Sequence, residues 1–290
     1  MANEFAIQAH HVFQFSKNVE LLLQQRSSRF EEAVTTANYS GDKAQVIMQL
    51  GEVEMEQLNS SDWKSDTQWS DIEHFQRWVF PGDFALSLPV TNQDQLRMIP
   101  DPRSQYAEAV RAAYCRKVDD VIISAALGAA KTGRYDDLKT TAFPADQVIS
   151  GTGGLTVEKL IDAKEKLMAA GNSPDEPRYF ACSEKQLSDL LKNTKVQSMD
   201  YNTVRALVKG ELDTFLGFKF ISTERLPLEA AGRQCLAWVK SGLHFATWQK
   251  LDIKSDLRPD KNYVWQIYAR ATLGAARTEE KKVVRVDCVE

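Results

Sequence analysis

One stretch of the chain, residues 101–131, limits the possible folds most, because it predicts a single helix of unusual length. Asp101-Pro102 supplies a cap with proline at the first helical position, and Gly133 ends the stretch. Its apolar residues recur at spacings of three and four: Tyr106, Val110, Tyr114, Val118, Val121, Ile122, Ala125 and Ala129. About 28 helical residues would extend roughly 42 Å, whereas an ordinary helix has about 11–12 residues.

Two extended stretches before this helix predict a long β-hairpin. Residues 43–58 and 75–88 have largely alternating apolar and polar side chains, and the second stretch is broken at Pro81-Gly82. The polar segment 59–71 lies between the two stretches. Aromatic residues lie within or beside the strands: Trp63, Trp69, Phe75, Trp78, Phe80 and Phe84. Because a two-stranded hairpin is only marginally stable alone, these side chains need a partner surface in the same chain or in a neighbour.

The N-terminal segment is also expected to need a partner. Its apolar points include Phe13, Phe15, Val19, Leu22 and Leu23, and the last four fit a short helical stripe with a Gln-rich exposed face. Such a short helix buries little apolar surface against itself.

The remainder predicts a mixture of helices and strands. Helices are expected at 157–170, capped by Thr156, and at 184–191, capped by Ser183. Strands are expected at 179–182, 215–221, 235–239, 263–270 and 283–286. A polar loop at 256–262 and a turn at Gly274 would separate the last strands.

Composition excludes several classes of protein. The 36 Lys and Arg against 40 Asp and Glu give a net charge of −4, without the basic excess of a dedicated nucleic-acid binder. No signal peptide and no apolar run long enough to span a bilayer are found, so a soluble protein made in a reducing cytoplasm is expected. The four cysteines are far apart in sequence and are interpreted as buried thiols.

No pattern predicts catalysis, a cofactor or a metal site. Gly151-Thr-Gly-Gly154 lacks the Lys-Ser/Thr of a phosphate loop, and His10, His11, His74 and His244 lack metal-ligand spacing. Asp119-Asp120 is interpreted as a solvated helix face, since adjacent helical residues point about 100° apart. Glu279-Glu-Lys-Lys282 is interpreted as a self-neutralising exposed turn.

The order of these parts resembles the major capsid protein fold of tailed bacteriophages, which encapsulin shells also use. Local stretches resemble one phage capsid subfamily: Arg77-Trp-Val-Phe-Pro81, Asp94-Gln-Leu-Arg-Met98, Asp101-Pro-Arg-Ser-Gln-Tyr106, Asp119-Asp-Val-Ile122, Gly128-Ala-Ala-Lys-Thr-Gly133, Asp200-Tyr-Asn-Thr-Val204, Thr214-Phe-Leu-Gly-Phe-Lys-Phe-Ile221, Gly274-Ala-Ala-Arg277 and Glu279-Glu-Lys-Lys-Val-Val284. The resemblance covers nearly the whole chain, and it is the joint order of these stretches that is specific.

The resemblance implies an α+β capsid fold with five regions. These are an N-terminal arm at 1–42, an extended loop (the hairpin) at 43–97, a peripheral domain at 98–150 with its spine helix at 103–131, an axial domain at 151–240, and a return to the peripheral domain at 241–290 with the C-terminal strands.

It also implies where one subunit would contact another. Hairpin contacts would come from Trp63, Lys64, Trp69 and Trp78, and arm contacts from Phe13, Phe15 and Leu22. A peripheral loop near a three-fold axis would contribute Arg258, Asp260 and Asn262. Some members of the fold cross-link a hairpin lysine to an asparagine, and Lys64 and Asn262 are the suggestive pair, for which chance placement is the favoured interpretation.

The expected function is therefore structural. The chain would assemble with itself, as hexamers and pentamers, into an icosahedral head shell that encloses double-stranded DNA in a virion, after assembly in the bacterial cytoplasm. A separate scaffolding protein, a portal and a decoration protein are the expected partners; sequence-specific DNA binding and a membrane are not expected. The alternatives are an encapsulin-like compartment with a protein cargo, and a soluble α/β enzyme.

Overall fold

A computed structural model describes residues 27–41, 45–51, 53–55, 69, 71–90, 103–134, 137–151, 153–192, 214–229 and 232–289. The fold is a mixture of helices and sheets, and the chain divides into two compact units. The first unit consists of Met1–Ser27, Phe84–Arg116 and Leu251–Ala271, and the second of Ser28–Asp83, Lys117–Lys250 and Thr272–Glu290.

The long helix, α2, spans Arg103–Leu127. Its buried side chains follow a helical stripe that includes Val110, Val118 and Ile122. The helix was expected to reach residue 131, and this expectation is wrong. The Gly128 N–H makes its bond to the Ser124 carbonyl at 2.8 Å, and Ala130–Thr132 then forms strand β5. Strand pairing on both sides of β5 ends the helix early.

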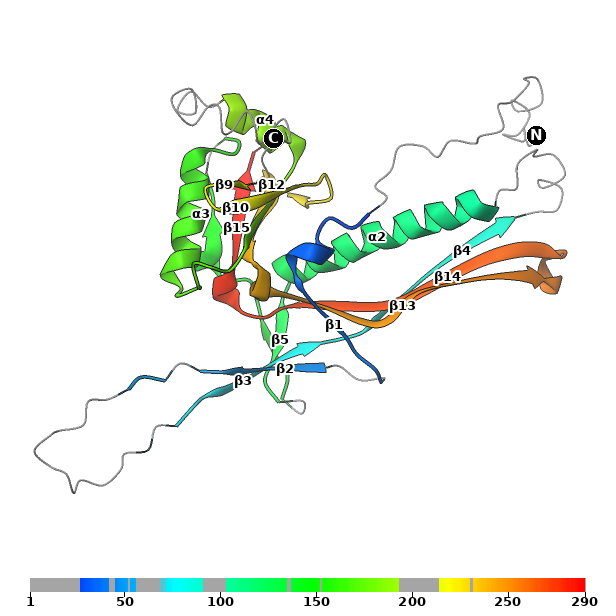
Figure 1. Ribbon diagram of the computed structural model, residues 1–290, viewed down its shortest axis with the longest axis horizontal. Helices are drawn as coiled ribbons and strands as arrows, with labels where there is room; N and C mark the ends of the chain where they lie inside the picture. Colours follow the sequence, from blue (N-terminus) through cyan, green and yellow to red (C-terminus); the bar gives the residue numbers. More distant parts are fainter. Residues whose placement is uncertain are drawn as a thin grey trace, which may run out of the picture. The chain divides into compact units, whose positions relative to one another are not determined.

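A four-stranded sheet has the order β1-β13-β14-β4, and its strands are β1 (Thr35–Asn38), β4 (Gly82–Val90), β13 (Leu243–Arg258) and β14 (Val264–Arg277). In the first unit, Val110 packs against Ile267 and Ala269 of β14, with Tyr106 and Trp265 beside them. Figure 1 shows the first part of α2 beside β14, in agreement with this contact.

Two expectations about the C-terminal strands are wrong. Residues 256–258 belong to strand β13, and the turn that follows is only Pro259–Lys261 with Asn262 and Tyr263 in the left-handed region. Gly274 lies inside β14 and forms no turn. A Cβ there would lie 2.4 Å from the Phe80 carbonyl oxygen, so glycine permits a close approach of two backbones.

The second unit contains a seven-stranded sheet of order β7-β15-β12-β8-β10-β9, with β11 paired to β12. Its strands are β7 (Val148–Ile149), β8 (Arg178–Cys182), β9 (Thr214–Phe215), β10 (Phe218–Ser222), β11 (Leu228–Glu229), β12 (Gly232–Val239) and β15 (Val283–Cys288). Helix α3 (Val157–Ala169) packs against β15, β12 and β7, and α4 (Glu184–Lys192) follows β8 (Figure 1). The Thr156 side chain accepts a bond from the Lys159 N–H at 3.3 Å, which confirms the predicted cap.

A third sheet, β2-β3-β5-β6, also lies in the second unit. Its strands are β2 (Gln45–Leu50), β3 (His74–Val79), β5 (Ala130–Thr132) and β6 (Lys139–Thr141), and all its pairs are antiparallel. The break expected at Pro81-Gly82 is confirmed, because β3 ends at Val79 and β4 begins at Gly82. Short 3₁₀ turns occur at Glu31–Ala33, Ala145–Gln147, Lys240–Gly242 and Glu280–Lys282.

Candidate functional site at the base of the hairpin

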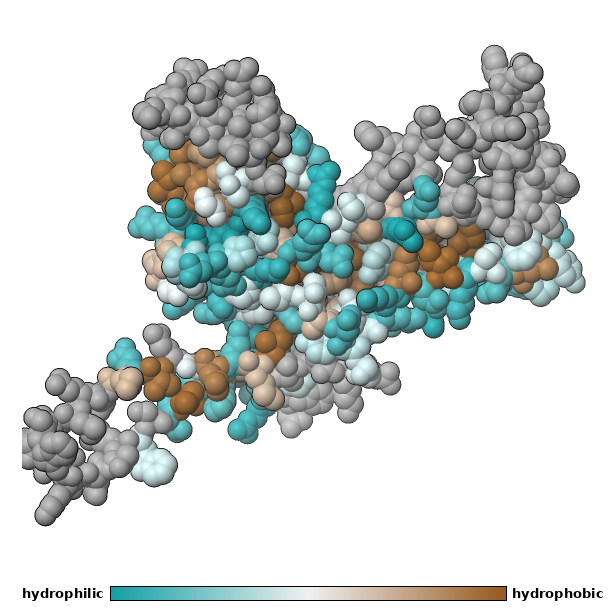
Figure 2. All heavy atoms as spheres, viewed as in Figure 1, coloured by the Kyte–Doolittle hydropathy of each residue, from teal (hydrophilic) through white to brown (hydrophobic). Residues whose placement is uncertain are grey.

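The two faces of the β2–β3 hairpin differ. The register pairs Met48 with Gln76 and Leu50 with His74, so these side chains share one face, here called the outer face, with Trp78. On it, Met48 is 79% exposed and Leu50 68% exposed. Figure 2 shows hydrophobic side chains gathered over these strands. Met48 and Leu50 therefore place exposed apolar surface on β2, opposite the polar Gln76 and His74 of β3. Contiguous exposed apolar surface often marks an interaction site.

The opposite, inner face is covered near the base of the hairpin. Val79 of β3 is fully buried with Ala246 of β13 and Ala276 of β14, and Ile47 of β2 packs against this cluster. Within the second unit, the inner face therefore packs the hairpin against β13 and β14. The exposed side chains Met48 and Leu50 lie on the opposite, outer face.

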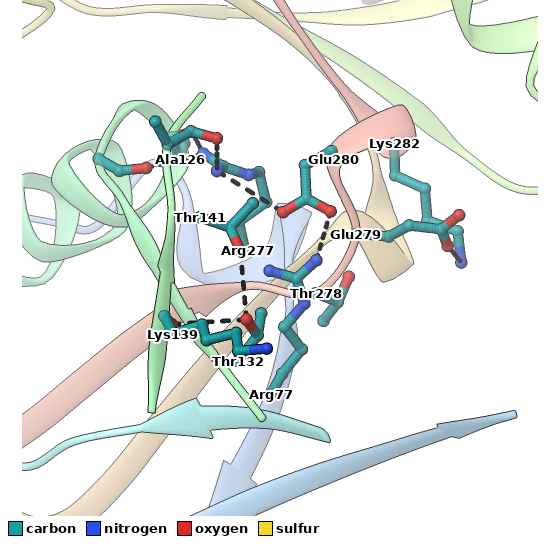
Figure 3. Close-up of polar contacts among 12 residues, drawn as sticks. Arg77, Ala126, Thr132, Lys139, Thr141, Arg277, Thr278, Glu279, Glu280 and Lys282 are labelled. Carbon is teal, nitrogen blue, oxygen red and sulfur yellow. Dashed lines mark hydrogen bonds and ion pairs between the residues drawn. The ribbon is translucent and has the colours of Figure 1, made fainter. Parts of the chain in front are cut away.

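A buried ion cluster fixes the hairpin at the same place. Arg77 of β3 donates from Nη2 to the Glu280 carboxylate, and the two side chains are 9% and 21% exposed. Arg277 of β14 lies 3.9 Å from the other Glu280 oxygen. Figure 3 shows the two guanidinium groups pointing toward the carboxylate between them. One carboxylate thus serves two arginines from different strands.

Arg277 is fully buried and ties the cluster to the end of α2. Its Nη1 donates to the carbonyl oxygens of Ala126 at 2.8 Å and Gly128 at 2.9 Å, and its guanidinium carbon lies 5.0 Å from the centre of the Phe143 ring. Carbonyl groups at a helix C-terminus carry partial negative charge, which stabilises a cation. Burial lowers the pKa of Arg277 from its ordinary value. The cap of α2 is therefore supplied by a residue distant in sequence.

The neighbouring strand orients Trp78. Its indole Nε1 donates to the Gly133 carbonyl oxygen at 2.7 Å, just after β5. Thr132 of β5 and Thr141 of β6 are joined through their hydroxyls at 3.2 Å. The half-buried Trp78 indole is thus held in place on the outer face, at the end of the hairpin that is nearest to β5.

Two charge interpretations from the sequence need correction. Residues 279–282 form a turn in which Glu279 pairs with Lys282 at 3.4 Å, as expected, but Glu280 is part of a buried ion cluster and is not an exposed residue of a self-neutralising turn. Asp119 is fully buried, and its neighbour Asp120 is paired with Arg225 at 2.6 Å, so this pair is not a solvated face. Arg77 and Arg225 lie 203 and 105 positions away from the carboxylates that they pair with, so local charge patterns do not reveal these two pairs.

The whole chain was compared with known proteins. A family model described as phage capsid protein matches residues 7–290. The chain belongs to the phage capsid protein family.

Solved structures of phage capsids share the fold of this capsid protein. The capsid structure of cyanophage P-SCSP1u has 15% identity, covers 100% of this chain and 97% of its own, and gives a TM-score of 0.73. The Ralstonia phage GP4 capsid has 11% identity, coverages of 96% and 94%, and a TM-score of 0.71. Mycobacterium phage Che8 has 15% identity, coverages of 94% and 96%, and a TM-score of 0.67. No curated protein matches the chain.

The predicted α+β capsid fold and the predicted family are both confirmed. The capsid protein is a structural component of a phage head, where it associates with further copies to form the virion shell. The family and the fold argue against an enzyme. Within the described residues, no three His, Cys, Asp or Glu side chains are placed to hold a metal ion, and no helix is long and apolar enough to cross a membrane.

The predicted contact residues of the capsid protein fall in different places. Phe13, Phe15, Leu22, Trp63 and Lys64 lie outside the described residues. Trp69 is 95% exposed, and Trp78 lies on the outer face. Among the described residues, the structure brings together the peripheral-loop group, Arg258, Asp260 and Asn262. All of these contacts between subunits remain predictions.

The peripheral-loop group lies at the turn between β13 and β14. Arg258 makes a bidentate pair with Asp260, with its Nε at 2.8 Å and its Nη2 at 2.6 Å, and donates to Gln266 at 2.8 Å. The hydrogen bond from Arg258 lowers the pKa of Asp260 to about 2. Asn262 follows with a φ of 56°. The turn therefore presents a fixed ion pair.

Three of the four cysteines are buried thiols, as predicted. Cys182, Cys235 and Cys288 are buried and Cys115 is partly exposed, all without disulfides. Burial raises the pKa of Cys182 well above its ordinary value, which favours the neutral thiol.

Arg77, Arg277 and Glu280 are site residues that sequence reasoning missed. Arg77 and Glu280 are separated by 203 positions, and no pattern around either residue predicts the pair. A buried arginine inside a strand could have been suspected only from the alternation of β14, which places Arg277 on the same face as buried Leu273.

Proposed function

We propose that this capsid protein assembles as hexamers and pentamers into an icosahedral shell around the double-stranded DNA of a tailed phage, with the outer face of its hairpin laid on an adjacent subunit. One observation carries the proposal: the hairpin has exposed apolar side chains on its outer face, and an ion pair fixes its base. Met48 and Leu50 face solvent, while Arg77 is held by Glu280. A ribbon whose base is fixed can present its apolar face in a defined direction.

The domain roles belong to the same proposal. The arm at 1–42 would contact another subunit, the hairpin at 43–97 would lie over a neighbour, and the axial domain at 151–240 would meet its copies around the symmetry axes. The peripheral domain, at 98–150 and 241–290, would bring the Arg258–Asp260 turn to a three-fold contact.

The charge of the chain supports a wall that does not hold DNA tightly. A net charge of −4 per subunit repels a polyanion, whereas a basic wall would bind it through counterion release. A separate scaffolding protein, a portal and a decoration protein are the proposed partners, with assembly in the host bacterial cytoplasm.

The test is to express the full chain alone and with its proposed scaffolding protein. We expect size-exclusion chromatography to give particles far larger than a 32.7 kDa subunit, and electron microscopy to show closed shells of one or a few regular sizes. Only small oligomers under both conditions would contradict the proposal.

Particles from the native source test the contents and the covalent state of the shell. DNA protected from nuclease is the expected content; a protein cargo without DNA would instead indicate an encapsulin-like compartment. Denaturing electrophoresis is expected to give a band near the 32.7 kDa subunit mass, and a ladder of higher bands would reveal covalent cross-links.

A further inference from the structure

The buried carboxylate of Asp119 is surrounded by hydrogen-bond donors from residues 28–30, which belong to the N-terminal arm at 1–42. Its Oδ1 accepts from the Ser28 hydroxyl at 2.6 Å, the Arg29 N–H at 3.1 Å and the Phe30 N–H at 3.4 Å. The Arg29 N–H also lies 3.3 Å from Oδ2. Successive donors on one carboxylate fix the direction of the backbone at residues 28–30, because each bond restricts the orientation of one peptide.

The side chains of the same segment add an apolar contact. Phe30 is fully buried and stacks on Trp238 of β12, with ring centres 5.6 Å apart. The Trp238 indole in turn donates to the Ala33 carbonyl oxygen at 2.9 Å. Residues 28–33 are thus held from both sides within the second unit, and residues 1–27 precede this fixed point.

A second contact joins the segment to the loop after β10. The Arg29 guanidinium donates to the carbonyl oxygen of Ser222, the last residue of β10. Three residues later, Arg225 makes a bidentate pair with Asp120, both bonds being 2.6 Å. Asp119 and Asp120 are neighbours on α2. Asp119 holds residues 28–30 and Asp120 holds Arg225 of the loop after β10. Arg29 links these two segments directly.

We propose that Asp119 is a positioning residue that fixes the backbone of the N-terminal arm at residues 28–30, here called the arm exit, and that Arg29 couples this exit to the loop at residues 222–225. The inference rests on the proposed function only in expecting the arm to serve contacts between subunits. The coupling itself is a property of one chain. A change at the loop would alter the arm exit, and the reverse, because Arg29 contributes its backbone to one site and its side chain to the other.

The test is amide hydrogen exchange, followed by mass spectrometry, on the full chain. Asp119→Leu keeps a similar side-chain shape but removes every acceptor. We expect exchange of the Arg29 and Phe30 amides to accelerate about tenfold or more, the effect of losing a buried acceptor. Exchange in β12 and β15 should stay unchanged. Unaltered exchange at residues 28–30 in this variant would overturn the inference.

A milder variant and a control complete the design. Asp119→Asn keeps one acceptor oxygen and loses the charge, so a smaller acceleration at the same amides is expected even where Asp119→Leu does not fold. Glu108→Leu replaces an exposed carboxylate on the same helix and should leave residues 28–30 unchanged. Equal acceleration in Asp119→Asn and Glu108→Leu would refute a specific role.

Arg29→Met tests the coupling, because it removes the guanidinium and keeps the backbone bonds to Asp119. The Arg225 N–H, which donates to the Thr223 hydroxyl at 3.3 Å, reports on the loop. Faster exchange of this amide is expected, and an effect confined to residues 28–30 would refute the coupling. Shell yield is measured separately: altered exchange with normal shells would retain this inference and contradict the proposed role of the arm.

Discussion

The outer face of the hairpin gives the sharpest prediction about assembly. Changing Met48 and Leu50 together to serine removes two apolar side chains that are 79% and 68% exposed in the subunit. Because both face solvent, the variant subunit should fold as the parent does, with a change in unfolding free energy within about 0.5 kcal/mol. If these side chains are buried by a neighbour, their loss must appear in assembly instead.

The magnitude follows from the area that assembly would bury. Fully burying a leucine or methionine side chain contributes about 1.5–3 kcal/mol. Scaled by the two exposed fractions, each residue could contribute roughly 1–2 kcal/mol, and the pair about 2–4 kcal/mol. At 1.4 kcal/mol for each factor of ten, even about 2 kcal/mol raises the free-subunit concentration in equilibrium with shells roughly 30-fold.

The assay is sedimentation of assembled shells, followed by measurement of the subunit left in solution. The matched control, Met48→Leu with Leu50→Met, keeps the apolar area and should keep the free concentration within about threefold of the parent, since such swaps cost little. A free concentration in the serine variant equal to that of the parent would refute the interface reasoning. Unfolding of the unassembled subunit by urea checks that the fold is retained.

Three further predictions concern the stability of the unassembled subunit. Glu280→Gln should lower the free energy of unfolding by urea by about 2–4 kcal/mol, slightly less than usual for a broken buried pair because the Glu280 side chain is 21% exposed. The double variant with Arg77→Met should lose less stability than the sum of the two single variants, and strict additivity would contradict the coupling of Arg77 with Glu280. Phe30→Ala should cost about 3–5 kcal/mol by the same measurement, and a loss below about 1 kcal/mol would show that the stack on Trp238 is not a core contact. His244 is bonded to the Tyr39 hydroxyl at 3.0 Å, and burial lowers its pKa from 6.5. Because the unfolded state then binds the proton more tightly, the stability present above about pH 6.5 should fall as the pH decreases. His244→Gln should lessen this pH dependence of stability, and an unchanged pH profile in the variant would contradict the prediction.

The sequence predicts well those elements whose buried side chains follow a regular spacing within the element itself. Helix α3 has its Thr156 cap and a clear apolar face, and it was expected within one residue of its observed end. Strands β8, β12 and β15 contain the expected stretches 179–182, 235–239 and 283–286, which are largely apolar and buried in a sheet. In each case the local pattern and the final environment agree, so no distant information is needed.

Strand β13 shows why other elements were missed. Its residues from 253 to 258 are exposed and carry mixed charges, which resembles a polar loop. The strand exists because it pairs with β14, and strand pairing is not visible in the pattern of one segment. The same reason applies to β5, whose three residues follow α2 and would otherwise continue it.

The ion cluster could not be predicted for a different reason. Sequence reasoning assigns charged residues to solvent, because burying a charge without a partner is very costly. Asp119 and Arg277 are nevertheless both fully buried, since each gathers several hydrogen bonds from segments that are distant in the chain. The default assignment fails wherever the fold, rather than the neighbouring sequence, supplies the partners.

These buried charges hold the hairpin and residues 28–30 of the arm, the two parts of the subunit for which contacts with neighbours are proposed. Apolar burial is not directional, so packing alone would leave a ribbon or an arm free to change its angle. Hydrogen bonds to an ionised group are directional, and removing one partner leaves a buried charge uncompensated. Arg77 on Glu280 and the backbone of residues 28–30 on Asp119 therefore hold the hairpin and the arm exit in set orientations within one subunit. Under the proposed function, subunits would meet with both segments already oriented, which would lower the conformational entropy lost when the shell forms.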